Sequence, residues 1–230
     1  MITPPAPLRG GTSPFVFETT LLGPAAAHRD LVMASWVLAG QGGLGPGAIP
    51  AVIRPVGELP LPVAPEGETL SLRLRSPLYI KHARTALQAD QLSARELLAA
   101  LSGRLALLHQ MHDLLPDAVV PEAWIQQAGS MELRGDTRHV AYSRYSQRQR
   151  QAMPLQGLLG ILTLDGVKDA GLRDALALGQ WLHIGAKTSQ GLGAYVLGAP
   201  SQACDRVERL PVSNTAHTET SHRSRKGAHA

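Results

Sequence analysis

The chain has 230 residues, of which 44% are hydrophobic and only 4% aromatic, and its formal net charge is +4. This length fits one large or two small domains, and the basic excess favours polyanionic partners such as nucleic acid. The single cysteine, Cys204, excludes an internal disulfide framework and a cysteine zinc site. Because the sequence shows no secretory signal and no apolar run long enough to span a membrane, we expect a cytoplasmic protein without membrane contact.

The first half of the chain predicts one helix and several short strands. Residues 1–13 are rich in Pro and Gly and predict an irregular start, and 14–18 predict a short strand. A mostly apolar helix is expected over 29–40, followed by a glycine-rich turn and a strand over 51–56. The alternating stretch 69–75 predicts a half-buried strand with a basic outer face. Its inward residues are Leu70, Leu72 and Leu74, and its outward residues are Ser71, Arg73 and Arg75.

Residues 93–112 form the clearest predicted helix of the chain. Ser93 and Glu96 have the spacing of a capping box at its start. Apolar residues then recur at helical spacing and predict a buried stripe. The members of this stripe are Leu97, Leu98, Leu101, Leu105 and Leu108.

The C-terminal half predicts further strands and one more helix. Residues 132–146 predict two strands joined by a turn at 134–136, where Arg-Gly-Asp occurs. Residues 158–164 predict another strand. A further helix is expected over 172–183, and a last strand over 194–197.

The order helix, loop with Gly-Leu-Gly, strand occurs twice, at 29–56 and at 172–197, which indicates an internal duplication. The second unit completes a β-α-β-β-α-β order, so the predicted fold class is α+β with ferredoxin-like (RRM-like) modules. The C-terminal module is expected to be complete and the N-terminal one partial. We expect the partial module at 1–60, the complete module with an inserted helix at 61–200, and a disordered tail at 201–230.

The segment 185–193, which we call the glycine loop, has the strongest functional signal. Glycines let a backbone approach an anion closely, while a lysine and two hydroxyl groups add charge and donors. The loop follows a helix and precedes a strand, so it is neither a Walker loop nor a dinucleotide fingerprint, and no cofactor is expected. An ordinary helix-to-strand turn is the alternative. The candidate binding residues are Gly185, Lys187, Thr188, Ser189, Gly191 and Gly193.

A second signal is the cluster of arginines with interleaved tyrosines at 142–150. Arginine forks suit phosphate groups, and tyrosine rings can stack on bases. A solvated edge strand or loop is the alternative. The candidate binding residues are Arg144, Tyr145, Arg148 and Arg150, to which the basic strand face adds Arg73 and Arg75.

Three segments, 142–149, 153–160 and 178–195, together resemble a known family. They are similar to the C-terminal module of the CRISPR precursor-RNA processing endoribonucleases of the RAMP superfamily. The resemblance is strong over 140–197 and looser over 14–139. In it, the glycine loop with its internal lysine resembles the RNA-contacting loop of that family.

The resemblance implies two ferredoxin-like modules that bind a repeat or hairpin of precursor CRISPR RNA, possible contact with other CRISPR effector subunits, and no metal ion. It also implies cleavage in which a ribose 2′-hydroxyl attacks the adjacent phosphate. That chemistry needs a base, an acid and cations for the phosphorane charge. The first helix of the family's front module often supplies a catalytic histidine, and this chain lacks that strand and helix. His183 and His28 are therefore the candidate catalytic residues, each with a surface or capping histidine as the alternative.

Two other functions stay open from the sequence. The incomplete front module favours a catalytically inactive subunit that holds CRISPR RNA within an effector complex. The third hypothesis is an unrelated ferredoxin-like protein in which the glycine loop is only structural.

Overall fold

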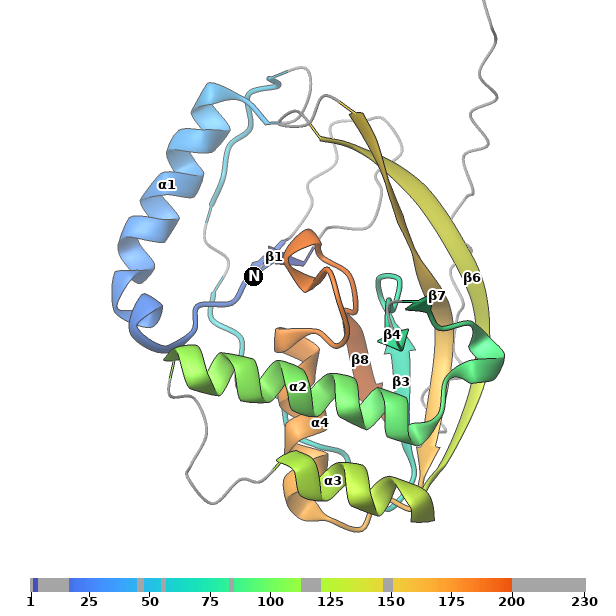
Figure 1. Ribbon diagram of the computed structural model, residues 1–230. Helices are drawn as coiled ribbons and strands as arrows, with labels where there is room; N and C mark the ends of the chain where they lie inside the picture. Colours follow the sequence, from blue (N-terminus) through green and yellow to red (C-terminus); the bar gives the residue numbers. More distant parts are fainter. Residues whose placement is uncertain are drawn as a thin grey trace, which may run out of the picture.

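The computed structural model describes residues 2–3, 17–44, 48–54, 57–82, 85–112, 121–146 and 151–199. The expected tail at 201–230 lies outside these residues. The largest unit follows the order β-α-β-β-α-β (Figure 1). Its elements are β3 (Leu70–Leu74), α2 (Ala94–His112), β6 (Glu132–Ser146), β7 (Gln151–Asp165), α4 (Ala170–Leu182) and β8 (Tyr195–Gly198).

These four strands form one sheet in the order β6-β7-β3-β8, and every neighbouring pair is antiparallel. In this order β3, the first strand of the unit, lies in the middle of the sheet. The last strand, β8, lies beside it at one edge. The helices α2 and α4 pack on the same face of this sheet (Figure 1). The predicted α+β class with a complete ferredoxin-like C-terminal module is therefore confirmed.

The core lies between the sheet and the two helices. The predicted leucine stripe of α2 is buried throughout, and Leu70 and Leu72 of β3 face it with no exposed surface. The helix begins as expected, because the backbone N–H of Glu96 donates to Ser93 Oγ at 3.4 Å. Leucine and alanine fill this core, as the shortage of aromatic residues predicts. The core residues of α4 are Leu172, Ala175, Leu176, Ala177 and Leu182.

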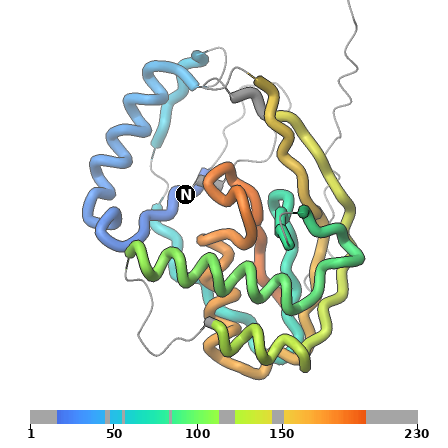
Figure 2. Tube along the Cα trace, in the orientation of Figure 1, coloured from blue at the N-terminus to red at the C-terminus, as the bar shows by residue number. Residues whose placement is uncertain are grey.

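The hairpin β6–β7 differs from the sequence prediction. Residues 134–136 are not a turn: they pair with 161–163 in the middle of a strand that is 15 residues long. The ladder continues without interruption because Gly135 packs against Leu162, where a Cβ atom would lie 3.0 Å from a methyl carbon of that leucine. The strand predicted at 158–164 in fact begins at Gln151. In Figure 2 the two long strands curve along one side of the molecule.

Several short elements were not predicted. After β3, β4 (Lys81–His82) and β5 (Thr85–Ala86) form a small hairpin, and η2 (Ala89–Gln91) precedes α2. After α2 come α3 (Pro121–Gln127) and η3 (Ala128–Ser130). The outer face of β3 is also less open than expected, because Ser71 is 3% exposed. The short η4 (Thr188–Gln190) lies within the glycine loop.

The N-terminal elements are β1 (Ile2–Thr3), β2 (Glu18–Thr19), η1 (Gly23–His28) and α1 (Arg29–Gly42). β1 pairs with β2, so part of the expected irregular start is a strand. The strand predicted over 51–56 is wrong for 51–54, which are irregular, and 55–56 lie outside the described residues. In the described chain, no helix combines the length and hydropathy needed to cross a membrane.

The helix α1 packs on one side only. The ring centroids of Trp36 and Phe17 lie 4.8 Å apart, and Gly40 is the one buried residue of the helix. Gly40 lies close to Ala51 and Ile53, which run alongside the end of the helix. The sides away from these contacts expose Leu31 and Leu38 at 67% and 65%. The partial N-terminal module therefore stays a prediction.

Candidate nucleic-acid interface

The glycine loop connects α4 to β8, and its backbone has several left-handed residues. Gly185, Gly191 and Gly193 have φ of 93°, 83° and 76°, and Lys187 has φ 58°. Glycine is required at two of these positions for space as well as for φ. A Cβ atom at Gly193 would overlap the carbonyl oxygen of Ile184, and one at Gly185 would lie 2.6 Å from the carbonyl oxygen of Tyr79.

Backbone hydrogen bonds attach this loop to the segment that follows β3. The N–H of Ala186 donates to Tyr79 O at 2.7 Å, and the N–H of Gly193 donates to Pro77 O at 3.0 Å. A third bond, from Ile184 N to Gly193 O at 3.0 Å, closes the loop at its base. The segment that follows β3 therefore holds the loop near both of its ends.

Lys187 has a left-handed backbone conformation and contacts two other segments. Its Nζ donates to the carbonyl oxygen of Pro154 in β7 at 3.2 Å, and it lies 4.9 Å from the centroid of the Tyr79 ring. Next to it, Thr188 is buried at 7% exposure while Ser189 is exposed. Lys187, Ser189 and Gln190 are thus the polar side chains of the loop that a ligand could reach.

His183 ends α4 and is fully buried. Its Nδ1 lies 3.2 Å from Leu192 O, and because a carbonyl only accepts, Nδ1 carries the hydrogen. Its Nε2 is buried and has no hydrogen-bond partner among the described residues. Burial lowers the pKa of His183 to about 4, an effect that the nearby Arg104 strengthens and the Leu192 carbonyl opposes. His183 is therefore neutral at pH 7 and has no surface with which to touch RNA in this conformation.

The arginine candidates lie in different places. Arg73 is half-buried on β3, on the face opposite the helices, and Arg75 is exposed, with its backbone N–H bonded to Ala194 O at 2.8 Å. The backbone of Arg144 and Tyr145 pairs with 152–153 of β7, while their side chains lie outside the description. Arg148 and Arg150 also lie outside the described residues.

His28 does not join the glycine loop. It is the exposed last residue of η1, whose first residue, Gly23, packs against His112 at the end of α2. The structure thus brings Lys187, Ser189 and the backbone of Arg75 to one region, at the end of β3 and the start of β8. His28 instead directly precedes α1.

Sequence reasoning missed Tyr79 and Lys81. The ring of Tyr79 packs with Leu155 and Leu192 in a small second core, under the glycine loop. Lys81 Nζ lies 5.5 Å from the centroid of the same ring. The short stretch 79–81 contains an aromatic residue and a lysine two apart, but nothing in its spacing links it to a loop so far along the chain.

The ferredoxin-like unit with a lysine-bearing glycine loop defines a class of RNA-processing proteins, and comparison with known families agrees. The model of the CRISPR-associated endoribonuclease Cas6 family matches residues 72–195, which is more than half of the chain. The protein therefore belongs to the Cas6 family. Comparison with curated proteins finds no sequence that matches significantly.

One solved structure shows the same fold over most of the chain, and others are similar over a smaller part. A product complex of a Thermus thermophilus Cas6 has 20% identity and a TM-score of 0.58, over 86% of this chain and 82% of that one. A product complex of another Cas6 has 20% identity and a TM-score of 0.40, over 59% of this chain and 53% of that one. A partial Cas6-RT-Cas1–Cas2 complex has 19% identity and a TM-score of 0.44, over 64% and 25%. The chain thus spans about half of the length of the second Cas6 and about a quarter of the length of the Cas6-RT-Cas1 chain.

Proposed function

We propose that this protein binds precursor CRISPR RNA and cleaves it within the repeats, without a metal ion, by attack of a ribose 2′-hydroxyl on the adjacent phosphate. The observation that carries the proposal is the glycine loop, which the family match covers and which the sheet holds so that Lys187 lies at its surface. A fixed ammonium group near a phosphate can stabilise the charge that develops in such a reaction.

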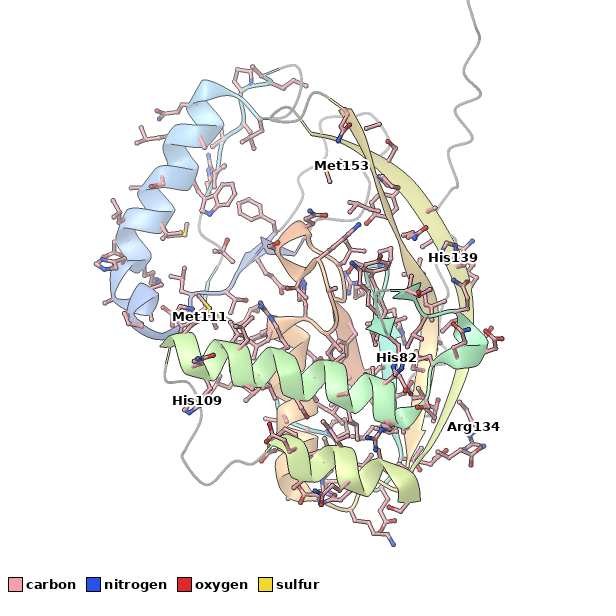
Figure 3. All side chains as sticks on the ribbon, viewed as in Figure 1. His82, His109, Met111, Arg134, His139 and Met153 are labelled. Atoms are coloured by element: carbon pink, nitrogen blue, oxygen red, sulfur yellow. The ribbon has the colours of Figure 1, made fainter. Side chains whose placement is uncertain are left out.

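The hairpin β6–β7 supports RNA binding as well. Residues 140–146 and 151–157 form a two-stranded ribbon, because the pairing of β7 with the segment of β3 ends at Leu158. Tyr142 is 45% exposed on this ribbon, and the backbone of Arg144, which was predicted to bind RNA, belongs to the same strand. His139 is exposed at the outer side of β6 in Figure 3. Exposed rings and cations on a ribbon suit stacking and phosphate contact.

The catalytic base is the part of the proposal that departs from the sequence prediction. Burial argues that His183 positions the loop and does not itself take a proton from RNA. His28 is exposed, so it stays the candidate base. The burial of His183 also favours the second candidate function, an inactive subunit that holds CRISPR RNA. The family match excludes the third, an unrelated ferredoxin-like protein.

The test is a cleavage assay in excess EDTA. The probe is end-labelled repeat RNA from the CRISPR array of the source genome, with a matched RNA that lacks the 2′-hydroxyl at the cut. We expect one EDTA-resistant cut that leaves a 2′,3′-cyclic phosphate and a 5′-hydroxyl, and no cut in the deoxy RNA. Tight binding without a cut would instead establish the inactive RNA-holding subunit, and absence of binding would overturn both.

A further inference from the structure

The ring of Tyr79 has two lysine side chains beside it. The Nζ atoms of Lys187 and Lys81 lie 4.9 Å and 5.5 Å from its centroid. Lys187 belongs to the glycine loop and Lys81 to β4, and Figure 1 shows these two segments next to each other above β3. Two cations from distant parts of the sequence therefore meet at one aromatic side chain.

Neither lysine is neutralised by its surroundings. Among the described residues, no carboxylate lies within ion-pair distance of either ammonium group, and the partner of Lys187 is the neutral carbonyl of Pro154. Lys81 is exposed and Lys187 half-buried, so both remain open to solvent. The attraction between a cation and a ring face leaves the positive charge in place, so the ring positions the two charges without neutralising them. An anion between or beside them would do so.

The ring itself cannot serve as a stacking surface for a base. Tyr79 is only 9% exposed, because Leu155, Leu192 and the two lysines cover it. What the two lysines offer at this place is ammonium charge, and the glycine loop adds the polar side chains of Ser189 and Gln190. Ammonium groups act as compact point charges that suit phosphate oxygens. The chemistry therefore fits the backbone of a nucleic acid strand.

We propose that Lys81 and Lys187, both held by Tyr79, form a clamp for the phosphate backbone of the RNA, so that the β4–β5 hairpin is a second RNA-contacting element beside the glycine loop. This inference rests on the proposed function, since it names a further contact for the same RNA. Because both contacts are to phosphates, the clamp strengthens binding of any sequence and adds to its salt dependence.

The test measures affinity for the repeat RNA at several salt concentrations by fluorescence anisotropy. Lys81→Gln should lower the affinity roughly three- to tenfold at low salt and reduce the slope of log K against log salt by about 0.7–0.9. Lys187→Gln should do the same, and the double variant should lose about twice as much slope. The control is Lys168→Gln, an exposed lysine in the turn after β7, which should leave the slope unchanged.

Two ring variants separate positioning from folding. Tyr79→Phe keeps the ring and should bind RNA like the wild type, whereas Tyr79→Leu should reproduce most of the loss seen in the double lysine variant. If Tyr79→Leu fails to fold, Tyr79→Phe and the lysine variants still test whether the clamp contacts the RNA. A wild-type slope for Lys81→Gln, in a protein whose wild type binds the repeat, overturns the clamp and leaves the proposed function standing. A wild type that does not bind the repeat overturns both.

Discussion

His183 lies where α4 passes into the glycine loop, with φ 61° and ψ 156°. Few residues other than glycine adopt this backbone conformation, which costs on the order of 1–3 kcal/mol and persists where the surroundings enforce it. Here the enforcement comes from complete burial and from the bond between Nδ1–H and Leu192 O. We therefore regard His183 as a positioning residue that couples the end of the helix to the end of the loop.

Burial of this histidine makes the stability of the protein depend on pH. The unfolded chain takes up a proton at His183 near its ordinary pKa of about 6.5, whereas the folded pKa is about 4. Between these values the unfolded state binds more protons, so the free energy of unfolding falls as the pH falls. The His183→Asn variant has no group at this position that titrates in this pH range, so it should not show this fall in the free energy of unfolding.

Urea denaturation at about pH 7.5 and about pH 4.5 measures the effect. We expect the wild type to lose on the order of 2–3 kcal/mol more than His183→Asn over this interval. Carboxylates titrate equally in both proteins, so they cancel in the comparison. If the free energy of unfolding fell by the same amount in both proteins, His183 would have to be accessible to protons in the folded state.

The position of the glycine loop could be predicted from the sequence, but the packing of other residues around it could not. The loop itself, with Lys187 and Ser189 at its surface, follows from glycine spacing and the position between a helix and a strand. The burial of His183 and the meeting of Lys81 with Tyr79 arise from tertiary packing between distant segments. No periodicity in a single sequence encodes such contacts.

The helix α4 approaches the sheet closely because it contains Gly179. A Cβ atom there would overlap the hydroxyl of Tyr195 and lie 3.2 Å from a methyl carbon of Leu101. That hydroxyl donates to Leu176 O, and burial raises the pKa of Tyr195. The glycine thus lets one tyrosine connect β8 to α4 just before the loop begins.

Gly179→Ala should destabilise the protein by on the order of 1–3 kcal/mol, since the added methyl group must displace Tyr195 or the helix. Gly103→Ala is the matched control. Gly103 lies in the middle of α2, is exposed, and has no atom within 4 Å of the place that a Cβ atom would take. There alanine should stabilise the helix by about 0.5–1 kcal/mol. Equal changes in thermal or urea stability for both variants would contradict the close approach of α4.

At the scale of elements, helices were predicted better than hairpins. The bounds expected for the helix at 93–112 differ from those of α2 by a single residue, because capping and periodicity are local signals. The Arg134-Gly135-Asp136 sequence has turn residues, yet cross-strand pairing with β7 overrides that preference. Strand pairing depends on a partner far along the chain, so β-propensity alone cannot fix where β6 ends.

The molecule as a whole is uneven in its packing. The ferredoxin-like unit has one large core, whereas α1 buries a single glycine and exposes Leu31 and Leu38. Local stability follows the number of buried apolar contacts, so regions such as α1 open more easily than the core. This explains why the composition predicted a substantial core but not its restriction to the C-terminal part.

Hydrogen exchange of the full chain measures this difference. Amides of α1 should exchange with protection far below that of α2, whose leucine stripe is buried. The helix α4 provides the internal control, because it is similar in length to α1 but packs against the core. Protection of α1 equal to that of α4 would show that its outer face is covered in solution.

The register of β6 and β7 has a consequence for how this family member can change. Every residue from Glu132 to Ser146 pairs in sequence with one from Asp165 to Gln151, without a bulge. Since side chains alternate between faces, adding one residue to a single strand would turn every later side chain to the opposite face. Two residues added to each strand would lengthen the ribbon by about 7 Å and keep each face as it is. The reach of the ribbon can therefore evolve in steps of residue pairs, independently of the core beneath it.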